Sequence, residues 1–176
     1  MNVVIDLETL GLSPSSVILS IGAVKENGDT FYTELDWRDQ QECGRTVDVS
    51  TCLWWGGQDK KLCPLDGTQT LYYALEGLQD FLECEKKEDL YIWARGTDFD
   101  IALLNHAFRQ EMLEIPWIYK NVRDIRTALA IKECMREDYN PILKHHALSD
   151  AIADMKNLAL RGLTTYDLRT AQSQEP

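Results

Sequence analysis

The sequence predicts one α/β domain in which strands precede most of the helices. Two observations lead to this class: apolar runs rich in β-branched residues stand at residues 3–5 and 17–24, and apolar residues recur at helical spacing from residue 71 onward. The 176 residues, 44% of them hydrophobic, suffice for one substantial core, and no repeat, linker or low-complexity segment interrupts them. We therefore expect one domain over residues 1–169 and a frayed tail over 170–176.

The N-terminal elements are expected to be strands. Both apolar runs have the composition of central strands that are buried on their two faces. Asn27-Gly28 is a strong hairpin signal, so residues 30–35 should pair antiparallel with the second strand. The pattern weakens over residues 36–68, where only a helix within 49–60 is indicated.

The later elements are expected to be one strand and several helices. Helical spacing predicts a helix over residues 71–82, and residues 90–94 are typical of a fourth, buried strand. Another helix should begin soon after Gly96, and two more are predicted over 124–137 and 147–161.

Composition excludes several classes of function. The 18 basic and 29 acidic residues give a net charge of −11, which argues against a broad basic surface for duplex DNA. No apolar run approaches the ~20 residues that span a bilayer, and residues 1–6 lack the features of a signal peptide. The five cysteines contain no C-x-x-C pair, unlike those of a zinc ribbon. We expect a cytoplasmic protein with no membrane partner.

The residues left for chemistry are mainly carboxylates, because the common glycine-rich nucleotide loops and zinc motifs are absent. Asp6 and Glu8 are one residue apart at the end of the first strand, so both side chains should project to the same side. Asp100 follows the fourth strand closely. His145 and Asp150 form the pattern H-x-A-x-x-D at the start of the last helix.

These carboxylates predict a metal site. Like charges gathered within a few Å raise one another's pKa, and two divalent cations would cancel the four charges. Oxygen ligands without sulfur select Mg²⁺ or Mn²⁺. Two such ions ~3.5–4 Å apart form the clamp used for in-line displacement at a phosphodiester. Histidine titrates near neutral pH, which suits His145 to accept a proton from the attacking water.

These motifs resemble those of a known enzyme family. Asp6-Leu7-Glu8-Thr9, Phe99-Asp100 and the stretch from His145 to Asp150 resemble the three exonuclease motifs of the DEDDh 3′–5′ exonucleases. A narrower similarity, to the group of exodeoxyribonuclease VIII-like and mycobacterial exoribonuclease-like proteins, rests on residues 6–24, Trp54-Trp55-Gly56-Gly57-Gln58, residues 99–108 and Asp124-Ile125-Arg126-Thr127. The resemblance implies an RNase H-like mixed β-sheet flanked by helices, and release of 5′-mononucleotides from 3′ ends by two metal ions.

The resemblance also implies roles for single residues. Asp6 would bridge the two ions, Glu8 and Asp150 would support the ion on the side of the nucleophile, and Asp100 would support the second ion. His145 would be the general base.

Substrate contacts follow from the same resemblance. Thr9 and Leu10 would line the 3′-terminal nucleotide through backbone and side-chain contacts. The partner would be a single-stranded nucleic acid with a free 3′ end, and relatives of this kind suggest a homodimer. One departure affects substrate positioning: many members carry Asn shortly before the Phe-Asp pair, where this chain has Arg95-Gly96-Thr97-Asp98.

Two of the assigned residues have close competitors. Asp98 competes with Asp100, but Asp98 or Thr97 is better explained as the cap of the following helix, because such side chains accept hydrogen bonds from free backbone N–H groups. His146 competes with His145 but does not fit the register of the H-x-A-x-x-D pattern.

Other residues near the motifs have two interpretations. Asp154, one turn after Asp150, is expected at the surface rather than as a fifth ligand. Trp54 and Trp55 either stack on bases or, as is more common, pack in the core or an interface. Arg126 either contacts phosphate or forms an ion pair.

Two alternatives to this function stay open. One is oligoribonuclease-like degradation of short RNAs, and the other is a catalytically silent nucleic-acid-binding protein on the same fold. Nothing in the sequence shows contacts to the sugar 2′-position, so DNA and RNA are both retained as substrates.

Overall fold

The computed structural model describes residues 1–59, 63–83, 86–132 and 134–168. The predicted tail over 170–176 lies outside the described residues. The strands are β1 (Asn2–Thr9), β2 (Ile18–Lys25), β3 (Thr30–Glu34), β4 (Tyr91–Ala94) and β5 (Val122–Asp124). The helices are α1 (Trp37–Glu42), α2 (Val49–Gly56), α3 (Leu71–Leu82), α4 (Asp100–Gln110), α5 (Ile125–Ile131) and α6 (Ala147–Leu160), with short 3-10 turns at Lys87–Asp89 and Tyr119–Asn121.

The strands form one mixed sheet in the order β3-β2-β1-β4-β5. The pairs β1–β2 and β2–β3 are antiparallel, whereas β1–β4 and β4–β5 are parallel. The predicted turn at Asn27-Gly28 joins β2 to β3, and Gly28 takes a φ of 100°, which glycine adopts readily. The carboxyl ends of β1, β4 and β5 therefore meet at one edge of the sheet.

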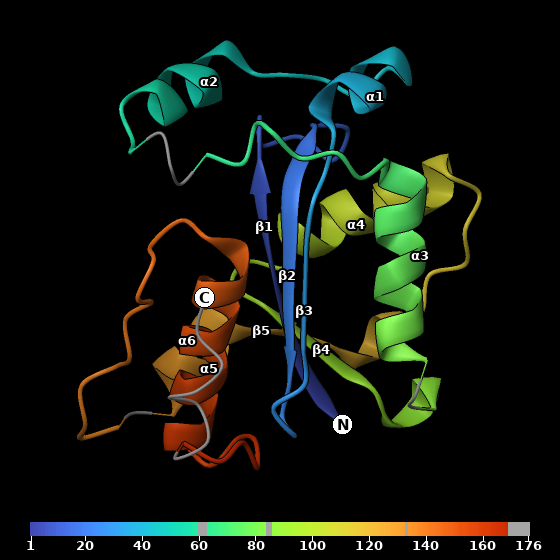
Figure 1. Cartoon of the computed structure of the whole chain (residues 1–176). Coiled ribbons are helices and arrows are strands. Elements are labelled where there is room, and N and C mark those ends of the chain that lie inside the picture. Colours follow the sequence, from blue (N-terminus) through green and yellow to red (C-terminus); the bar gives the residue numbers. More distant parts are fainter. Residues whose placement is uncertain (60–62, 84–85, 133, 169–176) are drawn as a thin grey trace.

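Helices cover both faces of this sheet, as Figure 1 shows: α3 and α4 lie on one side, and α5 and α6 on the other. Along β1, Val3, Ile5 and Leu7 belong to the core with α3 and α4, whereas Val4 belongs to the core with α6. Because side chains alternate along a strand, Asp6 and Glu8 share the face of Val4 and point toward α6.

Two further helices lie beyond the carboxyl end of β1. Figure 1 shows α1 and α2 above the arrowhead of β1. The side chain of Trp55 in α2 is buried in a small cluster with Leu10 and Val17. Its indole Nε1–H donates a hydrogen bond of 2.9 Å to the carbonyl oxygen of Thr9, which fastens α2 to the end of β1.

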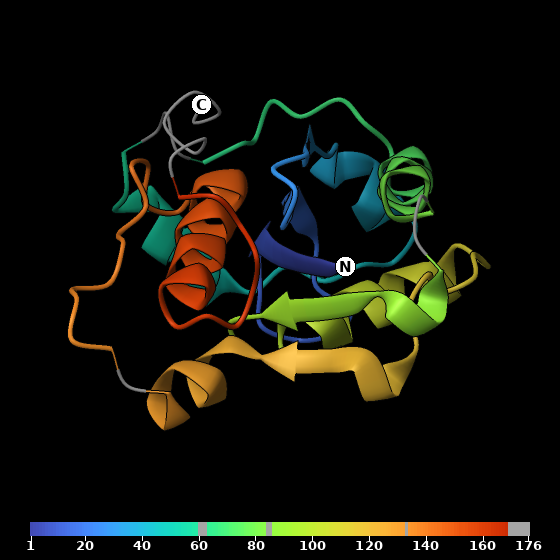
Figure 2. The same ribbon diagram turned by 90° about the horizontal axis from the view of Figure 1, so that it is seen from below.

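Several element boundaries differ from the sequence prediction. β5 was not expected; it is only three residues long, and Figure 2 shows it alongside β4. The helix predicted over 124–137 ends at Ile131. The predicted cap by Thr97 or Asp98 is wrong, because the N-cap of α4 is Phe99, without a side-chain hydrogen bond. In the described part of the chain, no helix is long and apolar enough to cross a membrane.

Candidate metal centre

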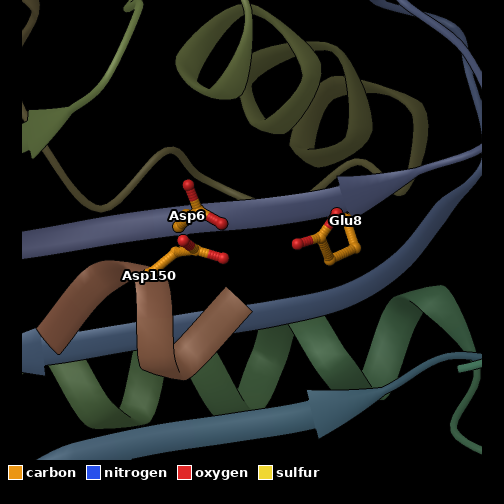
Figure 3. Close-up of side chains that lie close together, drawn as sticks. All are labelled: Asp6, Glu8 and Asp150. Carbon is orange, nitrogen blue, oxygen red and sulfur yellow. The ribbon is translucent and has the colours of Figure 1, made fainter. Parts of the chain in front are cut away.

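Three carboxylates meet where β1 faces the start of α6. Asp6, Glu8 and Asp150 each offer one oxygen, and these three oxygens all lie within 4.8 Å of one another. Figure 3 shows the carboxyl groups of Asp6 and Asp150 side by side, with that of Glu8 directed toward them. An irregularity in the β1–β2 register falls between Glu8 and Thr9, next to this cluster. Such irregularities re-aim side chains near functional sites.

The fourth predicted ligand stands apart from this group of three. Asp100 opens α4, is 2% exposed, and its carboxylate accepts a hydrogen bond from the backbone N–H of Leu7. It lies near enough to Asp6 to be the strongest of the charges that raise the pKa of that residue. Asp100 thus approaches the cluster beside Asp6, where a second cation would be shared.

The electrostatics of the cluster fit a bound cation. Burial is the main cause that raises the pKa of Asp6 well above its usual range, and the neighbouring carboxylates add to it. Burial, followed by Asp150 and Asp100, raises the pKa of Glu8 to about 8. Burial also raises the pKa of Asp100 to about 7. The pKa of Asp150 is raised above its usual value, again mainly by burial. These groups need positive charge to ionise together, and an all-oxygen set suits Mg²⁺ or Mn²⁺.

The first turn of α6 fixes the position of Asp150. One of its oxygens accepts a hydrogen bond of 3.1 Å from the backbone N–H of His146. His146 is the N-cap of α6: its Nδ1 accepts a hydrogen bond from the backbone N–H of Ser149, and its ring stacks on Tyr32 at 4.5 Å between centroids. His146 is therefore a structural residue that orients Asp150.

Gly22 in β2 allows α6 to come this close to the sheet. Gly22 pairs with Asp6 in the β1–β2 register. A Cβ atom at this position would overlap the peptide group between Ala147 and Leu148 at the start of α6. The absence of a side chain at Gly22 is thus what lets Asp150 reach Asp6.

Gly22→Ala is expected to destabilise the fold by about 1–3 kcal/mol, the usual cost of overpacking. It should also weaken Mn²⁺ binding, because α6 must move and carries Asp150 with it. Gly56→Ala in α2 is a matched control, since a Cβ there meets no atom outside its own helix within 4 Å. Chemical denaturation and Mn²⁺ titration of both variants test this, and equal behaviour of the two would contradict it.

His145 occupies the position between the carboxylates and α2. Its backbone φ of 64° is unusual for a residue with a side chain. Its ring meets the indole of Trp54 edge-on, at 4.8 Å between centroids. Burial raises the pKa of Asp150, and His145 lies close enough to this carboxyl to offset part of that rise. The structure therefore places His145 beside Asp150, with its ring against Trp54, and its role as general base stays a prediction.

A pocket of about 440 Å³ opens on the Glu8 side of the cluster. We call it the aromatic pocket; its apolar walls are formed by Leu7, Leu12, Trp54, Trp55 and Phe99. Trp55 is buried, in agreement with the packing interpretation, whereas Trp54 is 41% exposed. Trp55 therefore packs in the interior, whereas stacking of Trp54 on a base stays a prediction.

The two predicted substrate residues lie differently with respect to this pocket. Thr9 lines it, and its hydroxyl donates a hydrogen bond of 2.8 Å to the carbonyl oxygen of Gly11. The side chain of Leu10 packs instead in the cluster of Val17 and Trp55. Contacts of Thr9 and Leu10 with a nucleotide stay a prediction.

Asp154 and Arg95 form an ion pair that sequence reasoning missed. Asp154 is only 5% exposed, so its expected place at the surface is wrong. Nε of Arg95 lies 3.0 and 2.9 Å from the two carboxylate oxygens of Asp154, and Nη2 also bonds this carboxylate. The pair joins residues 59 positions apart in the sequence, so no local pattern indicated it.

Metal-free protein is expected to lose thermal stability as the pH rises from about 5 to 8. The pKa values of Glu8, about 8, and Asp100, about 7, exceed the usual 4.5 and 3.8, so the folded chain keeps protons that the unfolded chain releases. Raised carboxyl pKa values favour folding at low pH, and this contribution disappears as the pH passes them.

Mn²⁺ should reverse this loss, with a gain in melting temperature that grows over the same pH range, because ions bind deprotonated carboxylates of the folded chain. Calorimetric melting scans with EDTA or Mn²⁺ at several pH values measure both effects. A melting temperature independent of pH in EDTA and unmoved by Mn²⁺ would contradict the expectation.

Comparison with solved structures shows the fold. The chain is similar to exonuclease I crystallised with SSB and an inhibitor (TM-score 0.65, 13% identity). The match covers 97% of this chain and 43% of the exonuclease I chain. The chain also resembles the nuclease domain of 3′hExo, a DEDDh family member bound to rAMP, over 94% of both chains (TM-score 0.56, 17% identity). The Mg²⁺- and Mn²⁺-bound form of S. pombe Pop2p matches 89% of this chain and 81% of its own (TM-score 0.59, 17% identity).

These likenesses confirm the predicted RNase H-like sheet, and the chain spans less than half the length of exonuclease I. No curated protein matches the chain. Residues 1–160 match a sequence family described as the 3′–5′ exoribonuclease Rv2179c-like domain. This match covers all motif residues from Asp6 to Asp150. The chain therefore belongs to the 3′–5′ exoribonuclease Rv2179c-like domain family.

Proposed function

We propose that this chain is a metal-dependent exonuclease that removes 5′-mononucleotides from the 3′ end of single-stranded nucleic acid. The observation that carries the proposal is the cluster of Asp6, Glu8 and Asp150 beside a pocket with aromatic walls. The cluster suits a phosphodiester held by cations, and the pocket suits one nucleoside. The family description supports the direction of cleavage.

The residues of the cluster fit two cations. Asp6, Glu8 and Asp150 would hold the first, and Asp6 with Asp100 the second. Bound there, divalent ions would neutralise the charge of the scissile phosphate and lower the pKa of an attacking water. His145 then takes the proton of that water on its imidazole, and the edge of Trp54 keeps the ring in place. The water oxygen would form a new bond to phosphorus while the bond from phosphorus to the 3′-oxygen of the preceding nucleotide breaks. That oxygen takes up a proton and becomes the 3′-hydroxyl of the shortened strand, and the phosphate leaves with the 5′-mononucleotide.

The aromatic pocket explains why one nucleotide would be removed at a time. Its volume of about 440 Å³ matches the small end of ligand pockets and accommodates a single nucleoside. Aromatic faces stack on any base, so cleavage should depend little on sequence. The family description names RNA, and the rAMP bound to 3′hExo is a 5′-mononucleotide, so we propose RNA as the preferred polymer.

Digestion of end-labelled RNA and DNA oligonucleotides with Mg²⁺ or Mn²⁺ tests this function. A 5′ label should appear in a ladder of products shortened from the 3′ end, and a 3′ label should be released as mononucleotide. Preference for the shortest RNAs would instead indicate the oligoribonuclease-like function. Binding without any shortening would favour the silent nucleic-acid-binding protein. The predicted homodimer is tested by light scattering of the same preparation.

A further inference from the structure

The carboxylate cluster lies between two cavities of different chemistry. Glu8 lines the aromatic pocket, whereas Asp6 and Asp150 line a second cavity of about 310 Å³. We call this second cavity the arginine pocket; Arg95, Tyr139 and Lys144 also line it. A strand whose scissile phosphate sits at the cluster has one nucleoside on each side, and the aromatic pocket accounts for only one of them.

The arginine pocket is less acidic than its carboxylates suggest. Asp154 is bonded to Nε and Nη2 of Arg95. Asp138 forms an ion pair with Arg161 at 2.7 Å. The remaining carboxylates of the wall are Asp6 and Asp150, whose charge bound cations would neutralise. With those cations in place, the charge of Lys144 makes the wall of the arginine pocket positive.

The ion pair with Asp154 fixes the orientation of Arg95 but does not use all of its hydrogen-bond donors. Its side chain is 42% exposed, whereas that of Asp154 is 8% exposed. Among the described residues, the hydrogen bonds of Arg95 use Nε and Nη2, which leaves the protons of Nη1 for a ligand. A guanidinium fixed on one edge by a carboxylate is a preorganised donor for phosphate oxygens.

The loop on the opposite wall is also fixed in place. The backbone N–H of Tyr139 donates to the side chain of Asn157 at 2.7 Å, and the amide of Asn157 donates back to the carbonyl oxygen of Tyr139 at 3.0 Å. Tyr139 is 40% exposed and lines the pocket. Its ring offers a surface for a base next to the donors for a phosphate.

We propose that the arginine pocket binds the nucleotide preceding the scissile bond, with Arg95 and Lys144 contacting the phosphate on its 5′ side. The inference rests on the proposed exonuclease function and extends it by a second nucleotide subsite. It assigns a substrate-binding role to Arg95, which lies in the stretch Arg95-Gly96-Thr97-Asp98 shortly before the Phe-Asp pair.

The test compares two substrates that differ only beyond the scissile bond. A nucleoside 5′-(4-nitrophenyl phosphate) fills the cluster and the aromatic pocket but has nitrophenol in place of the preceding nucleotide. A short oligonucleotide of the same sugar and base has the preceding nucleotide and its phosphate. Steady-state kinetics of Arg95→Gln and Lys144→Gln on both substrates, at several salt concentrations, isolate the upstream contact.

Each variant should lose about tenfold more kcat/KM on the oligonucleotide than on the ester, mainly through KM, as expected for one charge-assisted hydrogen bond. The salt dependence of log KM should become shallower by about 0.7 for the lost phosphate contact. Arg38→Gln removes an equal charge from the exposed surface of α1. It should change neither the ratio of kcat/KM between the two substrates nor the salt dependence of log KM.

Two results would overturn the inference. In the first, Arg95→Gln lowers kcat/KM equally on both substrates, and Lys144→Gln changes neither the ratio of kcat/KM between the substrates nor the salt dependence of log KM. Arg95 would then serve only to neutralise Asp154. Lys144 is exposed, so its variant reports on the pocket even if Arg95→Gln destabilises the fold. In the second, the wild-type protein hydrolyses neither substrate, which would remove the proposed function itself.

Discussion

Asp6→Asn is expected to reduce hydrolysis by about 10³-fold or more, because it removes the carboxylate that we propose contacts both cations. The same change should raise the melting temperature of the metal-free protein. Asp6 lies close to Asp100, Glu8 and Asp150, so its replacement relieves a repulsion that the fold otherwise tolerates. Each 1 kcal/mol of relief corresponds to about 2–4 °C for a domain of this size.

Activity and melting temperature must be measured together on this variant. The increase in melting temperature that Mn²⁺ gives to the wild type should be lost in Asp6→Asn. Asp80→Asn, on the exposed face of α3, is the matched control and should keep both activity and the response to Mn²⁺. An Asp6→Asn protein that still shortens RNA at the wild-type rate would remove Asp6 from the mechanism.

His145→Ala is expected to lower kcat by about 10²–10⁴-fold, the usual contribution of a general base. Its binding of Mn²⁺ should persist, because the three oxygens of the candidate metal site belong to Asp6, Glu8 and Asp150. This combination of retained metal binding and lost turnover separates a proton acceptor from a metal ligand. Single-turnover kinetics and Mn²⁺-dependent melting scans give the two readouts.

The neighbouring histidine provides the control for this variant. His146→Asn keeps a side chain that can cap α6, so the start of the helix and Asp150 should stay in place. Turnover should therefore fall far less than in His145→Ala. A larger loss from His146→Asn, with His145→Ala nearly unaffected, would reverse the assignment of the two histidines.

The strands near the N-terminus were predictable because local patterns specify them. The apolar run of β2 and the Asn27-Gly28 turn determine the hairpin without reference to distant residues. β5 and α1 escaped prediction for a physical reason. Three and six residues are too few for a periodic pattern, and both elements depend on tertiary neighbours. β5 pairs with β4, and Gln40 of α1 forms hydrogen bonds with the backbone of Ile18.

In the candidate site, too, local sequence patterns indicated some residues, whereas others depend on tertiary contacts. Asp6 and Glu8 followed from alternation along β1, and Asp150 from its motif at the start of α6. The contribution of Gly22 was not visible in the sequence, since it depends on how closely α6 approaches β2. The ion pair between Arg95 and Asp154 was equally hidden, because it joins residues 59 positions apart.

The most direct test of the central claim is anomalous X-ray diffraction from crystals grown with Mn²⁺. We predict one peak within bonding distance of Asp6, Glu8 and Asp150, and a second, ~3.5–4 Å away, beside Asp6 and Asp100. An active protein whose crystals show no anomalous peak at these carboxylates would contradict the account.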